Sequence, residues 1–227
     1  MLRLLLASLA TVLSSASASF AAPEADESER AAMSLAVELG GSAMVDDKLD
    51  ESARVAVKLP SANDVALRRL CKMPSVGSVE ILDATECTGA GVATLKELPD
   101  LQSLVLGKFP VKEKEAAAIG TLRTLNVLFI GESTLTDTTF AQFKKLVNLR
   151  VLDVSDCTIT DKSATVLVGL KKLEELNLSR TKFGDAGVTS LKSLEKLRLL
   201  RLNQTNVTRK GIDALEEARG KDLTVRW

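Results

Sequence analysis

The stretch Leu170–Leu191, LKKLEELNLSRTKFGDAGVTSL, decides the fold. Its leucines close up from a spacing of three to a spacing of two, and a spacing of two places Leu176 and Leu178 on one side of a strand with Asn177 on the other. Gly184-Asp185 then indicates a turn and a helix start, and the apolar residues after it follow at helical spacing. One strand, one turn and one short helix cannot bury these leucines alone, so the stretch needs copies of itself.

The copies lie at intervals of 24 residues. Leucines occur at each step of 24 on either side of Leu176, at 104, 128, 152 and 200, and each has an apolar residue three positions before it and two after it. Five units in one register, with a period of roughly 20 to 29 and an L-x-x-L-x-L core, indicate a leucine-rich repeat. Two degenerate units precede them, at 55–70 and 73–95. The segment 223–227, LTVRW, is expected to be a closing strand, with Trp227 covering the open end of the core.

The repeats LRVLDVSDCTITDKS and LEELNLSRTKFGDAG resemble the cysteine-containing leucine-rich repeat subtype, which occurs in F-box substrate receptors and in many secreted bacterial proteins. The lead-in LAVELGGSAMVDDKLDESARVAVKL is similar to the N-terminal cap of the secreted bacterial group. The resemblance covers about residues 30–227. It implies an α/β fold, a right-handed solenoid with a curved parallel sheet on the concave face and short helices on the convex face. It also implies a surface that binds other macromolecules, and it brings no catalytic residues.

Composition weighs against catalysis. The 227 residues include no histidine and no tyrosine, which excludes histidine bases, histidine metal ligands and every catalytic arrangement that needs a histidine. The formal net charge is zero, so the sequence gives no indication of a nucleic-acid partner. We expect a protein that is not an enzyme and that has neither a cofactor nor a metal. Cys157 fits a structural position in the repeat, and Cys71 and Cys87 are either free or joined in a disulfide.

The N-terminus has the pattern of an exported protein. Arg3 precedes an apolar run at 4–13, and small residues allow cleavage after Ala18 or Ala21. We expect a signal peptide at 1–21, an acidic N-terminal segment with a helix and hairpin cap at 22–52, and the leucine-rich repeat domain with its closing strand at 53–227. The apolar run is too short for a membrane span, so the mature protein is expected in the periplasm or outside the cell. An uncleaved anchoring helix is the alternative.

Within this plan, local signals place individual elements. Residues 24–29 are acidic and are expected to lack regular structure, and a helix over 32–39 should end at Gly40-Gly41. Strands are expected at 43–45 and 54–58. Short helices should begin near four aspartates, and threonines are expected as N-caps of two of these helices and of a further helix near the C-terminus. The aspartates are Asp64, Asp137, Asp161 and Asp185, and the threonines are Thr136, Thr160 and Thr208.

The candidate binding residues come from the strand positions between the buried leucines. Neighbouring strands lie ~4.8 Å apart, so residues 24 apart form columns across the concave face. Exposed apolar side chains with a rim of opposite charges are typical of protein-binding surfaces, although valine and phenylalanine also favour strands for their own sake. The candidate partner-binding residues are Val105, Val127, Phe129, Val151, Asp153, Asp156, Asn177, Arg180, Arg198 and Arg201.

The sequence therefore predicts an exported, monomeric, non-catalytic scaffold that binds another protein or a peptide through its concave face. Two alternatives remain open. One is an envelope- or carbohydrate-binding structural protein, which the scarcity of aromatic side chains on the strands disfavours. The other is an intracellular F-box-like substrate adaptor, which would require the N-terminal segment not to be a signal peptide.

Overall fold

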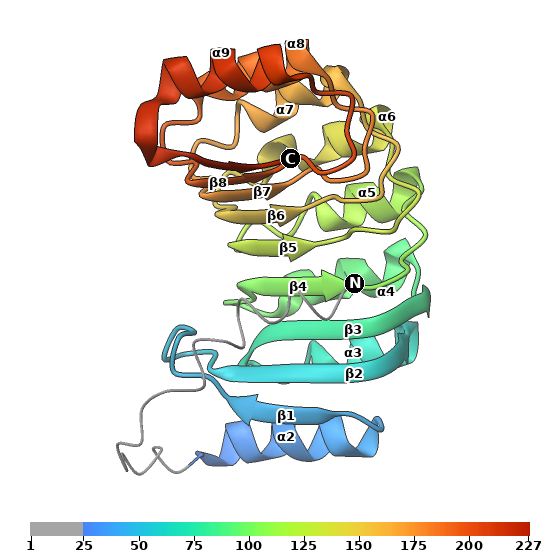
Figure 1. Cartoon of the computed structure of the whole chain (residues 1–227). Coiled ribbons are helices and arrows are strands. Elements are labelled where there is room, and N and C mark those ends of the chain that lie inside the picture. Colours follow the sequence, from blue (N-terminus) through green and yellow to red (C-terminus); the bar gives the residue numbers. More distant parts are fainter. Residues whose placement is uncertain (1–24) are drawn as a thin grey trace.

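Nine strands form one continuous sheet in the computed structural model, which describes residues 25–227. The strands follow one another across the sheet in chain order, so each repeat lies beside the next one in the sequence (Figure 1). β1 pairs with β2 antiparallel, and every later pair is parallel. The predicted signal peptide lies outside the described residues.

The strands begin close to their expected positions. Those from β4 onward begin within one residue of the positions that the 24-residue spacing predicts, whereas β2 and β3 are longer than the rest. The strands are β1 Ser42–Val45, β2 Val55–Asn63, β3 Val76–Glu86, β4 Ser103–Leu106, β5 Val127–Phe129, β6 Val151–Asp153, β7 Glu175–Asn177, β8 Leu199–Arg201 and β9 Thr224–Arg226.

Short helices cover one face of the sheet (Figure 1). The four aspartates expected to begin helices do begin them. The α-helices are α2 Glu27–Glu38, α3 Asp64–Leu70, α4 Gly89–Thr94, α5 Glu113–Ile119, α6 Asp137–Phe140, α7 Ala164–Leu167, α8 Asp185–Ser190 and α9 Arg209–Arg219. The 3₁₀ helices are η1 Leu95–Glu97, η2 Ala141–Lys145, η3 Asp161–Ser163, η4 Leu191–Ser193 and η5 Gly220–Asp222.

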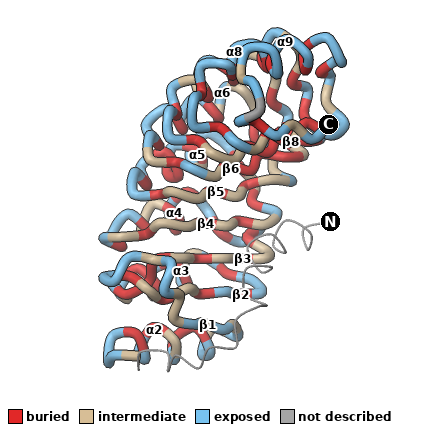
Figure 2. Tube along the Cα trace, turned by 60° about the vertical axis from the view of Figure 1, so that its left-hand side comes forward, coloured by how far each residue is buried: buried red, intermediate tan, exposed pale blue. Residues whose placement is uncertain are grey.

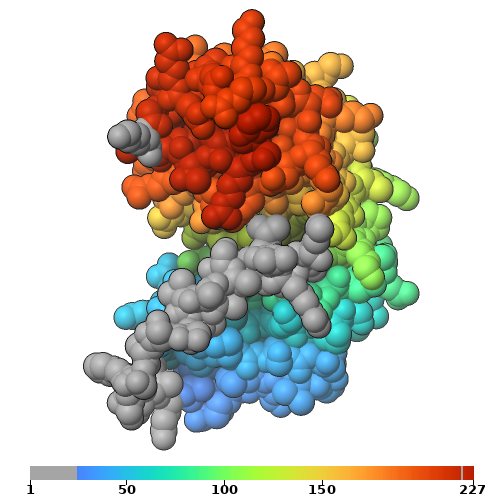
Figure 3. All heavy atoms as spheres, in the orientation of Figure 1, coloured from blue at the N-terminus to red at the C-terminus, as the bar shows by residue number. Residues whose placement is uncertain are grey.

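The core runs the length of the stack between the sheet and the helices. Buried and less buried residues alternate along β4, β5 and β8 (Figure 2), and the central leucine of each of the five regular repeats is at most 1% exposed. Burying one such side chain contributes roughly 1.5–3 kcal/mol. Because each inner repeat contacts its neighbours on both sides, this stabilisation is shared between repeats. Figure 3 shows the parts of the chain following one another in sequence order from one end of the molecule to the other.

The N-terminal end is closed by α2 and the β1–β2 hairpin. The expectation that residues up to 29 lack regular structure is wrong from Glu27 onward. Asp26 accepts a hydrogen bond from the Glu29 N–H at 2.8 Å, and the Glu29 carboxylate accepts one from the Asp26 N–H at 2.9 Å. This reciprocal capping box starts the helix early. The same Glu29 side chain is buried against Arg54, with a carboxylate to guanidinium distance of 2.8 Å, which ties α2 to the sheet.

The C-terminal end differs from the expectation for Trp227. Its ring does not cover the core, because it is 50% exposed and lies 5.8 Å from the Arg209 guanidinium carbon. Leu223 is the buried apolar residue of this end. Arg219 at the end of α9 donates hydrogen bonds to three backbone carbonyl oxygens ahead of β8, those of residues 194, 195 and 197. The side chain of Arg219 therefore attaches the last helix to the backbone of the preceding repeat.

Aspartate side chains also link consecutive repeats on the helix side. The Asp137 carboxylate accepts hydrogen bonds from the Thr160 N–H at 2.9 Å and the Thr160 hydroxyl at 2.7 Å. Asp185 accepts the same two bonds from Thr208, each at 2.7 Å. Thr208 occupies the predicted N-cap position of α9, but its hydroxyl accepts no hydrogen bond from that helix, whereas the hydroxyls of Thr136 and Thr160 do accept one from theirs. The hydroxyl of Thr208 donates to the preceding repeat instead.

Candidate binding surface

The predicted columns exist on the open sheet face, which is the face of the sheet opposite the helices. The pairing register places residues 24 apart directly beside one another from β4 to β8. One column is Val105, Phe129, Asp153, Asn177 and Arg201, and its neighbour is Ser103, Val127, Val151, Glu175 and Leu199.

Four apolar side chains of these columns form what we call the apolar patch: Val105, Val127, Phe129 and Val151. Each is partly exposed. Val105 pairs with Phe129, and Val127 pairs with Val151, so the patch spans three neighbouring strands, about 10 Å at a strand spacing of ~4.8 Å. The two next positions in the Phe129 column are polar, and they border the patch on its C-terminal side.

Asp153 and Asn177 were expected to project into solvent, but their side chains are buried. They are 4% and 3% exposed, because each side chain bonds within the fold. Asp153 accepts hydrogen bonds from the N–H and the hydroxyl of Ser155, at 2.9 and 2.6 Å, and a further bond from the Asn177 amide at 2.8 Å. Asn177 in turn accepts from the Ser179 N–H at 3.1 Å. The two side chains fix the turns that follow their strands, so they belong to the scaffold of the open sheet face.

A second set of polar residues follows the strands and forms a rim. All five adopt the left-handed backbone conformation, with φ between 53° and 58°: Lys108, Glu132, Asp156, Arg180 and Gln204. Asp156 and Arg180, two predicted binding residues, form an ion pair with each other, and Lys108 pairs with Asp83 at 3.1 Å. The hydrogen bonds that the Arg180 guanidinium donates to the Asp156 carboxylate raise the pKa of Arg180 above its ordinary value. The spacing of 24 residues places these five side chains in one column, but it does not indicate their backbone geometry, because none of the five is glycine or asparagine.

The arginines at the C-terminal end of the face are differently placed. Arg201 is partly buried and lies 3.7 Å from the Glu175 carboxylate. Arg198 is exposed and lines a hollow of about 460 Å³ at the edge where the strands begin. Its other lining residues are Glu174, Glu195, Lys196 and Asp222. The mixed charges of this hollow suit no single charged ligand.

All three cysteines are buried free thiols, and burial raises the pKa of Cys87 to about 12 and also raises that of Cys157. A protonated buried thiol is a poor nucleophile. No group of residues within 25–227 has the arrangement of a metal site. Among the helices of the same part of the chain, none has the length and apolar character required to cross a membrane.

The fold defined by these observations is the leucine-rich repeat fold. A leucine rich repeat family model matches residues 123–183. Comparison with curated proteins gives no match. Among solved structures, the chain is similar to an internalin (inlF) from Listeria monocytogenes, with 23% identity and a TM-score of 0.56 over 75% of this chain and 46% of that one. It is also similar to internalin C2 from the same species, with 17% identity and a TM-score of 0.52 over 75% of this chain and 79% of that one. The chain thus spans about half the length of the first of these structures.

Proposed function

We propose that this protein is an exported, non-catalytic scaffold that binds another protein or a peptide, as a monomer, through the open sheet face. The observation that supports the proposal is the apolar patch. Its four side chains are held in register on three neighbouring strands, and all four remain partly exposed. Exposed apolar side chains that are grouped and bordered by charges favour a macromolecular partner.

The geometry also indicates what kind of contact the surface makes. Two of the rim charges, Asp156 and Arg180, are paired with each other, and Asp153 is already satisfied by its neighbours. We therefore assign the binding free energy mainly to Phe129 and the three valines. The charges of Arg198 and Arg201 orient the partner on the surface and increase its association rate.

Panning the full chain against a random peptide display library tests this proposal. We expect recovered peptides to be rich in apolar residues and to bind Phe129→Asp at least tenfold more weakly, because the new carboxylate would be desolvated against them. Val65→Asp is the matched control, since Val65 is 56% exposed on α3, away from the sheet face. Circular dichroism should show both variants folded. Equal binding to wild type and Phe129→Asp would remove the patch from the binding surface.

A further inference from the structure

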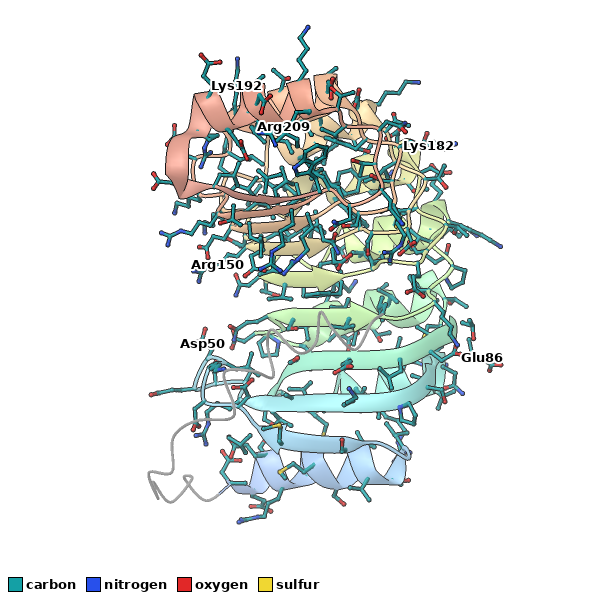
Figure 4. The ribbon with its side chains drawn as sticks, viewed as in Figure 1. Asp50, Glu86, Arg150, Lys182, Lys192 and Arg209 are labelled. Carbon is teal, nitrogen blue, oxygen red and sulfur yellow. The ribbon has the colours of Figure 1, made fainter. Side chains whose placement is uncertain are left out.

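The zero net charge of this protein hides a strong asymmetry between the two edges of its sheet along β5 to β8. The seven-residue segments that precede β5, β6, β7 and β8 are 120–126, 144–150, 168–174 and 192–198, and we call this edge the basic edge. It contains nine lysines and arginines against two glutamates. The corresponding segments that follow the four strands, 131–137, 155–161, 179–185 and 203–209, contain three basic and five acidic residues. Figure 4 shows Arg150 where the strands begin and Lys182 on the opposite side.

The charges of the basic edge are available to a ligand. Every one of its lysines and arginines is exposed. Of these nine, Arg150 alone forms an ion pair with an acidic group of the described residues, to Glu174 at 2.8 Å. Lys172 donates to the Asn148 amide oxygen at 2.8 Å, and Lys171 to the Ser193 carbonyl at 3.3 Å, so both keep their full charge. Apart from the Arg150–Glu174 pair and the acidic residues that line the hollow beside Lys196 and Arg198, the edge is therefore a positive surface on a protein with no net charge.

The spacing of these charges follows the repeat. Consecutive segments precede strands that lie ~4.8 Å apart, so the four segments present positive charge over about 15 Å along the solenoid. A linear polymer with an acidic group on most of its units can contact several of these segments at once. Such contacts are favoured by the release of the polymer's counterions and weaken steeply with salt.

From this surface we infer that the basic edge binds an acidic polysaccharide. The edge has no aromatic side chain, and proteins that hold single-stranded nucleic acid without base pairing use aromatic stacking. It presents connections and short 3₁₀ helices, with no long helix to enter a duplex groove. Val147 is its one large exposed apolar residue, too little to insert into a bilayer. Lysine, a compact and strongly hydrated charge, supplies most of the cations, which suits flexible acidic polymers better than bidentate phosphate recognition.

Titrating labelled heparin, a sulfated polysaccharide, into the full chain at about 50 mM salt tests the inference. We expect saturable binding that weakens steeply with salt. The edge variant combines Lys144→Gln, Lys145→Gln, Lys171→Gln and Lys172→Gln, and it should bind at least tenfold more weakly with a shallower salt dependence. The matched control combines Lys112→Gln, Lys114→Gln, Lys162→Gln and Lys182→Gln, exposed lysines outside the edge. It has the same net charge and should bind like wild type.

The same titration is repeated with duplex DNA and with phosphatidylglycerol vesicles at the same concentration of negative charge. Both should bind the protein more weakly than heparin does. Three results would overturn the inference. They are the absence of heparin binding at low salt, equal heparin affinity of the edge variant and the control, and binding of DNA or vesicles as tight as that of heparin. The peptide panning above remains independent, because Phe129 lies on the open sheet face and not on this edge.

Discussion

At the scale of single residues, the rim column is the least expected feature. A left-handed backbone is unfavourable for residues with a side chain, by roughly 1–2 kcal/mol each, and glycine is the usual solution. Here five charged or polar residues adopt this conformation at the same point of five successive repeats. The fold therefore imposes the turn geometry, and the side chains at these positions remain free to vary in charge. The ion pair between Asp156 and Arg180 uses that freedom.

Substitution at Glu132 should reveal the backbone preference, since its φ is 57°. Asparagine tolerates the left-handed region, whereas the branched side chain of valine does not. We expect the free energy of unfolding of Glu132→Val to be about 1–2 kcal/mol below that of Glu132→Asn in urea denaturation. The same pair of substitutions at exposed Arg123, which lacks a positive φ, should differ by less. A difference of equal size at both positions would mean that side-chain chemistry, not backbone geometry, is responsible.

At the scale of elements, the hydrogen bonds that Asp137 and Asp185 accept from Thr160 and Thr208 attach one repeat to the next. We call these bonds the carboxylate links. Burial raises the pKa of Asp137, but hydrogen bonds from Ser163 and Thr160 outweigh it, so the pKa lies below its ordinary value. For Asp185 the hydrogen bonds from Thr208 dominate and lower the pKa. In both cases the folded protein favours the ionised carboxylate. The links therefore contribute stability above the pKa of the unfolded chain and lose it as the pH falls through the folded value.

We expect Asp137→Ala to lower the free energy of unfolding by roughly 1–2 kcal/mol at pH 7, because it leaves the Thr160 N–H and two hydroxyls without their acceptor. The difference from wild type should narrow below about pH 4, where the wild-type carboxylate becomes protonated first in the unfolded chain and then in the folded one. Urea denaturation from pH 7 to 3 measures both quantities. Asp213→Ala, which removes an exposed i,i+4 pair with Arg209, should cost less than about 0.5 kcal/mol.

At the scale of the whole molecule, the periodic part of the architecture could be predicted from the sequence and the specific part could not. The spacing of 24 located the strands, the short helices and the columns, since buried leucines repeat whatever else varies. The spacing could not show that the side chains of Asp153 and Asn177 are buried and bond to neighbouring residues. A polar residue between two buried leucines can be either exposed or buried. Trp227 was misplaced for a related reason. Its size suggested burial, but Arg209 provides it with a partner at the surface.

Unfolding of the whole molecule should depend on how its last repeat is attached. Trp227 is the single tryptophan, so its fluorescence reports on the C-terminal end, whereas far-ultraviolet circular dichroism reports on all repeats. In wild type we expect the two transitions to coincide. Arg219→Ala removes three hydrogen bonds to the preceding repeat, so the fluorescence transition should move to lower denaturant than the dichroism transition. Arg68→Ala, at an exposed position of α3, should leave the transitions together. Coincident transitions in Arg219→Ala would show that these bonds do not fasten the end.

The register of the sheet has a consequence for how this protein can change in length. The strands β4 to β8 pair with one another in one repeated alignment, each residue beside the one 24 positions further on, and β1, which runs antiparallel, closes one end. An in-frame duplication of 24 codons within 101–200 would add one more strand in the same alignment, with both ends of the chain unchanged. A longer strand stack in the structure of such a duplicated chain would confirm it. Each duplication would also add one residue to every column of the open sheet face and one segment to the basic edge. A single genetic event can therefore enlarge both surfaces together, and point mutation can afterwards specialise the new copy.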